Sequence, residues 1–238
     1  MSPVKALFWK EWRQMQWRLI FSSVVCCLFV FVGLKTRVLP DEVIFFLSFG
    51  ICAFLIPLFI AMGLVAEERE QGSLRLQLRL PVTARQVYIV KMTLGALAAS
   101  APTIASLIIA LIMAGNREKT SVEIIRAYGF AIPFEVVFML WTVVFSLKRK
   151  TQWAAALTGV VLLAVWEFLY IYDDMFLREI GWHTLSFVIT PFGFLLFCLQ
   201  GKSWWEMFVI IYPVQSILAV ILFWWGMRRF STLTRDGK

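Results

Sequence analysis

Residues 64–91 read LVAEEREQGSLRLQLRLPVTARQVYIVK and form the longest polar interruption in a chain that is otherwise mostly apolar. The stretch holds five basic residues, an acidic cluster and four alternating leucines: Arg69, Arg75, Arg79, Arg85 and Lys91; Glu67, Glu68 and Glu70; Leu74, Leu76, Leu78 and Leu80. Charged side chains are costly in hydrocarbon, so this stretch is expected outside it. Because the leucines add apolar surface, we expect a segment at one face of a membrane that binds a soluble partner.

The composition is that of a polytopic membrane protein. Of the 238 residues, 61% are apolar and 16% are charged, and the mean hydropathy is +0.79. The apolar runs use most of the length, so residues 1–238 are expected to form a single transmembrane domain. No Gly-rich phosphate loop is present, which argues against an ATPase domain in the same chain. The net charge of +8 fits basic residues beside membrane spans and not nucleic-acid binding.

The expected topology has six spans: residues 19–34, 43–66, 92–114, 127–147, 152–170 and 207–227. Residues 1–18 mix Lys, Arg and Trp and predict an interfacial helix on the cytoplasmic surface. Residues 184–200 are apolar but short and contain Pro191 and Gly193, so that either a spanning helix or a re-entrant hairpin fits them. A re-entrant hairpin before the last span is favoured, because a spanning helix would put the basic C-terminal tail outside. With both termini cytoplasmic, 16 Lys and Arg lie inside and 7 lie outside. This bias favours a multi-pass protein with both termini cytoplasmic. The expected location is the inner (plasma) membrane.

The central stretch is ambiguous by periodicity alone. Its leucines alternate strictly between residues 74 and 80, which by itself favours a strand. The order of its motifs resembles the cytoplasmic coupling segment of type-2 ABC exporter permeases: Glu68-Arg69-Glu70, Gly72-Ser73-Leu74, Leu78, Pro81, Arg85 and Lys91. That resemblance favours a coupling helix within residues 67–82. Pro81 is expected to end it, and Thr83 to cap the next helix.

The resemblance implies a fold and a set of partners. The fold is an all-α integral membrane protein with six transmembrane helices, the interfacial helix, the coupling helix and the re-entrant hairpin. A second permease copy, identical or related, would complete the translocation pathway. A separate ATPase subunit would bind ATP and Mg²⁺. This chain is therefore expected to need no cofactor and not to be an enzyme itself. The expected ATPase-coupling interface is Glu67, Glu68, Arg69, Glu70, Gly72, Leu74, Arg75, Leu78 and Arg79.

Two acids lie inside predicted spans, Glu135 in the fourth and Glu167 in the fifth. Ionisable groups are costly within a membrane, so both are candidates for the translocation path. Pairing with a helix neighbour is the other interpretation. The cysteines lie in apolar segments without paired spacing, which predicts free thiols. His183 is the only histidine, so we expect neither a metal site nor a catalytic constellation.

Other functions stay open. A haem or cytochrome-maturation export permease would have a similar size and topology. An ion-coupled carrier would use Glu135 and need no ATPase. A membrane scaffold would bind partners through the cytoplasmic segment and transport nothing. The sequence does not identify the cargo.

Overall fold

The computed structural model describes residues 2–36, 44, 47, 48, 50–70, 81–114, 118–149, 151–176 and 212–235. The regular secondary structure within these ranges is entirely helical. Three helices, Pro3–Thr36, Ile51–Glu70 and Ala84–Met113, are long and apolar enough to cross a membrane. The described part of the chain is therefore all-helical, and its apolar helices have the character of a membrane protein. The six-span count stays a prediction, and the hairpin at residues 184–200 lies outside the described residues.

Helix α1 (Pro3–Thr36) joins two elements that the sequence separated. No Gly or Pro occurs between Val4 and Val32, so nothing interrupts the backbone hydrogen bonds at Arg18. The expected division into an interfacial helix and a short first span is therefore replaced by one helix of 34 residues. At 1.5 Å per residue it is roughly 51 Å long, more than the ~30 Å hydrocarbon core of a bilayer. The interfacial position of its first half stays a prediction.

The second helix is continuous but not uniformly α-helical. It comprises η1 (Ile51–Leu55), α3 (Ile56–Ala61), η2 (Met62–Ala66) and α4 (Glu67–Glu70), with π-helical turns at η1 and η2. Pro57 cannot donate a hydrogen bond to the carbonyl of Ala53, and the wider turn of η1 precedes it directly. The helix continues through both π-turns, and so α4 is the extension of an apolar helix.

Helix α6 (Ala84–Ala114) begins at the expected cap. The Thr83 hydroxyl accepts a hydrogen bond from the Gln86 amide at 3.2 Å, and the Gln86 side chain accepts one from the Thr83 amide at 2.8 Å. This reciprocal pair is a capping box and confirms the prediction for Thr83. The small residues of α6 do pack inside the bundle, since Ala98 and Ala99 are buried and a Cβ on Gly95 would touch Leu64 and Met139.

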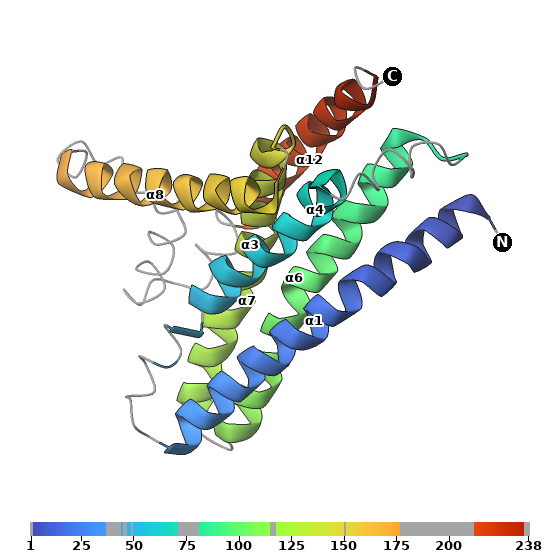
Figure 1. Ribbon diagram of the computed structural model, residues 1–238. Helices are drawn as coiled ribbons and strands as arrows, with labels where there is room; N and C mark the ends of the chain where they lie inside the picture. The colour runs from blue at the N-terminus through green and yellow to red at the C-terminus, as the bar shows by residue number, and fades with distance from the viewer. Residues whose placement is uncertain are drawn as a thin grey trace.

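Three further helices occupy the regions of the fourth, fifth and last predicted spans: α7 (Glu118–Ser146), α8 (Gln152–Phe176) and α12 (Tyr212–Arg235). In Figure 1, α1 lies along α6, whereas α8 runs across the direction of α6 and α7 and extends away from them. One face of α8 is uncovered and apolar, with Trp153, Leu157 and Phe168 all more than half exposed.

A hydrogen bond to the carbonyl of Gly129 connects α7 to α12. Pro133 lies four residues after Gly129 and has no N–H to donate to that carbonyl. The Tyr212 hydroxyl donates to it instead, at 2.7 Å. A hydrogen bond lost within α7 is thus replaced by one from α12.

Candidate functional site

Helix α4 carries four consecutive charged residues, Glu67, Glu68, Arg69 and Glu70. An α-helix turns about 100° per residue, so four consecutive side chains point around its whole circumference. The contacts of α4 follow this geometry, because these side chains reach α1, α6, the end of α7 and the start of α8. We call these four residues and their partners the α4 charge cluster.

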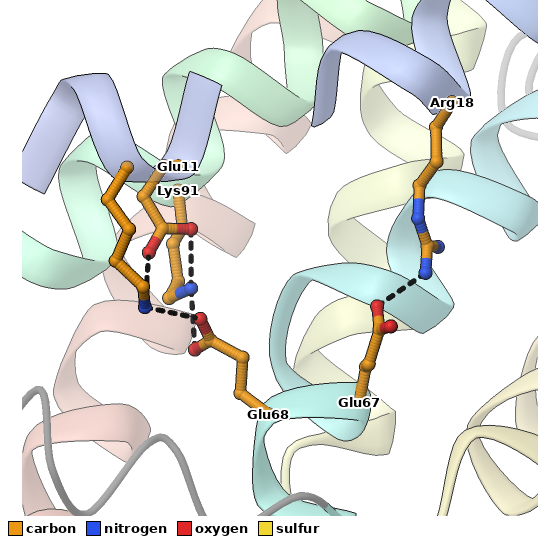
Figure 2. Close-up of polar contacts among 6 residues, drawn as sticks. Glu11, Arg18, Glu67, Glu68 and Lys91 are labelled. Atoms are coloured by element: carbon orange, nitrogen blue, oxygen red, sulfur yellow. Dashed lines mark hydrogen bonds and ion pairs between the residues drawn. The ribbon is translucent and has the colours of Figure 1, made fainter. Parts of the chain in front are cut away.

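The buried part of the cluster is an arrangement of two acids and two lysines. Lys91 on α6 places its Nζ 2.7 Å from Glu11 Oε2 on α1 and 2.6 Å from Glu68 Oε2. Lys10 Nζ lies 3.3 Å from Glu68 Oε1 and 3.7 Å from Glu11 Oε1. Figure 2 shows Lys91 between the two carboxylates. The formal charges of the two acids and the two lysines cancel. Charged groups removed from water need partners of opposite charge, and this arrangement supplies them.

Burial divides these four residues unequally. The side chains of Glu11, Glu68 and Lys91 are 4%, 3% and 1% exposed, whereas that of Lys10 is 38% exposed. Lys91 is therefore the cation from which water is excluded, and Lys10 keeps part of its hydration. Because α1, α4 and α6 each supply a buried charge, the arrangement links the three helices, and separating α6 would take Lys91 away from both buried acids.

Arg18 makes the second connection between α1 and α4. Its guanidinium forms an ion pair with Glu67 and donates a hydrogen bond to the carbonyl of Phe59 at 2.9 Å. The Arg18 side chain lies directly over Gly63, where a Cβ would meet the guanidinium. Glycine at this position thus gives Arg18 the room to reach Glu67, shown at the right of Figure 2.

Arg69 and Glu70 hold the junction between α7 and α8. Arg69 donates to the carbonyl of Leu147, just after the end of α7, with a longer contact to the carbonyl of Arg149. Glu70 Oε2 accepts a hydrogen bond from the amide of Gln152, the first residue of α8, at 3.0 Å. A cation at a helix C-terminus and an anion at an N-terminus both oppose the helix dipoles and satisfy unpaired backbone groups.

A small cavity of about 120 Å³ lies beside the cluster. It is lined by Glu11, Gln14, Met15, Arg18, Gly63, Leu64, Glu67 and Glu68. The cavity has room for a few ordered waters.

The predicted interface residues fall into two groups, those that the structure describes and those that lie outside the described residues. The acidic-basic run from Glu67 to Glu70 is engaged within the chain, and Glu68 is almost fully buried. Gly72, Leu74, Arg75, Leu78 and Arg79 lie outside the described residues. A contact between an ATPase and any of these residues stays a prediction, and the run from Glu67 to Glu70 has an internal structural role in addition.

Sequence reasoning missed the partners of this run, namely Lys10, Glu11, Arg18 and Lys91. One signal was present, because Glu11 interrupts an apolar face of the first helix. The structure shows that Leu7, Glu11 and Met15 follow one another along the buried face of α1. A charge on the buried face of an amphipathic helix requires a partner of opposite charge.

The two intramembrane candidates differ in what the structure shows. Glu135 is fully buried on α7, and its Oε1 accepts a hydrogen bond from the Thr103 hydroxyl on α6. Glu167 lies on α8, and its side chain is outside the described part of the chain.

Comparison with protein families, with curated proteins and with solved structures gives no match to this chain. Across the described ranges, no group of three or more His, Cys, Asp or Glu is arranged to hold a metal ion.

Proposed function

We propose that this chain is the permease subunit of a type-2 ABC exporter. It would lie in the inner (plasma) membrane with both termini in the cytoplasm, and pair with a second permease, identical or related. A separate ATPase subunit would bind ATP and Mg²⁺ and dock on the segment that follows α4. The proposal rests on the motif order of residues 67–91 and on the position of the α4 charge cluster.

The observation that carries the proposal is the connection of α4 to four helices. Residues 71–80, the part of the expected coupling segment 67–82 that comes after α4, follow directly after Glu70, and α6 begins soon after them at Ala84. Any displacement of that segment acts first on α4 and on the start of α6. The ion pairs and hydrogen bonds of α4 pass the displacement on to α1, α6 and the α7–α8 junction.

In this proposal, one set of residues contacts the ATPase and another set connects that contact to the membrane helices. Leu74 and Leu78 would supply the apolar contact with the ATPase, with Arg75 and Arg79 setting its register. The α4 charge cluster would hold the membrane helices to the segment, so that movement of the ATPase moves the helices as a unit. A loop without such connections would bind a partner but transmit little force.

A co-purification experiment tests the proposal. This chain is expressed with an ABC ATPase encoded beside it and purified in detergent and then in nanodiscs. The Leu78→Glu variant is expected to lose the ATPase while its membrane bundle stays folded, because a charge would enter the apolar contact. Gln77→Glu is the matched control, since it adds the same charge one residue away from the leucine.

The proposal fails if the wild-type chain retains no ATPase, or if Leu78→Glu retains it as well as Gln77→Glu does. In the first case a scaffold or an ion-coupled carrier becomes the better account. In the second, the segment at residues 71–80 is not the docking surface.

A further inference from the structure

Glu135 lies at a polar site inside the helix bundle, far along the chain from the α4 charge cluster. Its side chain is completely buried. Oε1 accepts the hydrogen bond from Thr103, and Oε2 has no hydrogen-bond partner within the described residues. Among the described residues, one oxygen of this buried carboxyl group therefore has no partner.

The side chains that interact with Glu135 among the described residues, Thr103 and Cys52, are polar but uncharged. Within the described ranges, the Cys52 thiol on η1 is the titratable group that interacts with Glu135, and it also interacts with the Thr103 hydroxyl on α6. Cys26 on α1 lies behind it, with its Sγ 3.7 Å from Cys52 Sγ. The described residues provide no Lys or Arg ion pair to Glu135, in contrast to the acids of the α4 charge cluster.

A carboxylate enclosed in this way requires a positive charge, because it is removed from water and no cationic side chain in the described part of the chain compensates it. A metal ion of the kind that binds oxygen needs six or more ligands, usually with several carboxylates. This site has one carboxyl group and the hydroxyl that binds it. A proton needs only the free oxygen, so it is the cation that the site fits.

Each of the two helices that hold the site, α6 and α7, contains a proline close to it. Pro102 immediately precedes Thr103 in α6, and Pro133 lies two residues before Glu135 in α7. Proline removes a backbone hydrogen bond and makes the helix easier to bend at that point. A bend at these two prolines is the movement that would open the site and admit water to the carboxyl group.

We infer that Glu135 is an intramembrane proton-binding site, in which Oε2 carries a proton that exchanges with water when α6 and α7 separate. The carboxylate takes up one proton to form the neutral acid, and the same O–H bond breaks when water accepts the proton. Thr103 positions the group by donating to Oε1. This inference does not depend on the ATPase coupling proposed above, and it holds for a permease or a carrier alike.

Infrared spectroscopy of the intact protein in nanodiscs tests the inference. The wild-type spectrum at neutral pH is expected to contain the C=O stretching band of a protonated carboxyl group that is lost in Glu135→Gln. The band should shift to lower frequency in D₂O, since the bound proton exchanges. Thr103→Val keeps the carboxyl group but removes its hydrogen-bond donor, so the band should remain and move to higher frequency. Ser100→Ala is the matched control, because the Ser100 hydroxyl bonds only the backbone of its own helix, at Ala96, and should leave the band unchanged.

Two results would overturn the inference. One is a wild-type band of ionised carboxylate that disappears in Glu135→Gln. The other is a protonated band that never shifts in D₂O, which would describe a permanently locked, structural acid. If Glu135→Gln does not fold, Thr103→Val decides alone, and a spectrum identical to that of Ser100→Ala would reject the site.

Discussion

Lys91→Met is the substitution that probes the α4 charge cluster most sharply. It keeps a long apolar side chain at a position that is 1% exposed and removes only the charge. Glu11 and Glu68 then lose the cation that lies 2.7 and 2.6 Å from their carboxylates. Lys10 remains, but at 3.7 and 3.3 Å and with 38% of its side chain exposed, so it compensates only in part.

The expected loss of stability is large for a single substitution. Breaking a buried ion pair by removing one partner costs about 3–5 kcal/mol, since the other charge stays buried and unpaired. For a chain of this length, that loss corresponds to a melting temperature lower by roughly 6–20 °C. Removing the charge of a fully exposed lysine changes stability by less than about 0.5 kcal/mol.

Thermal unfolding in nanodiscs, followed by the fluorescence of the tryptophans, measures this difference. Lys5→Met is the matched control, because Lys5 is exposed at the start of α1. The triple variant Glu11→Gln/Glu68→Gln/Lys91→Met should recover most of the loss, since it leaves no buried charge unpaired. Equal melting temperatures for Lys91→Met and Lys5→Met, or no recovery in the triple variant, would show that the cluster does not hold the helices together.

Two other contacts can be tested by the same unfolding measurement. Gly63→Ala should displace Arg18 and break its ion pair with α4, which should cost about 2 kcal/mol of stability. In the Arg18→Met background, Gly63→Ala should cost little more, since the ion pair is already lost. Fully additive losses of stability in the double variant would contradict this coupling. Tyr212→Phe should cost about 1 kcal/mol, because the carbonyl of Gly129 loses its donor. Pro133→Ala should remove that penalty by restoring the helical N–H, and a penalty of unchanged size in the double variant would contradict the assignment.

Some features of the fold follow from local sequence and were predictable. The all-helical character and the positions of the apolar helices follow from hydropathy. The cap at Thr83 depends on residues three apart, and the packing of α6 follows from its run of small residues. Each of these properties is determined by a short stretch of chain.

The features that the sequence did not reveal depend on distant residues. Lys91 pairs with Glu11 across 80 positions, and Arg69 reaches the end of α7 across 78. The sequence therefore suggested only an outside partner for the charges in residues 64–91, and several of them also bind within the chain. The continuity of α1 was missed for a different reason. The composition changes from polar to apolar at Arg18, and this change suggests a boundary between two elements, although the helical backbone continues through it.

The most direct measurement is the ATP hydrolysis rate and native mass of this chain reconstituted in nanodiscs with its candidate ATPase. The proposed function predicts a complex of two permeases and two ATPases, and a hydrolysis rate that depends on the permease and falls in Leu78→Glu but not in Gln77→Glu. An ATPase that neither joins this chain in a complex nor changes its hydrolysis rate in its presence would contradict the exporter function.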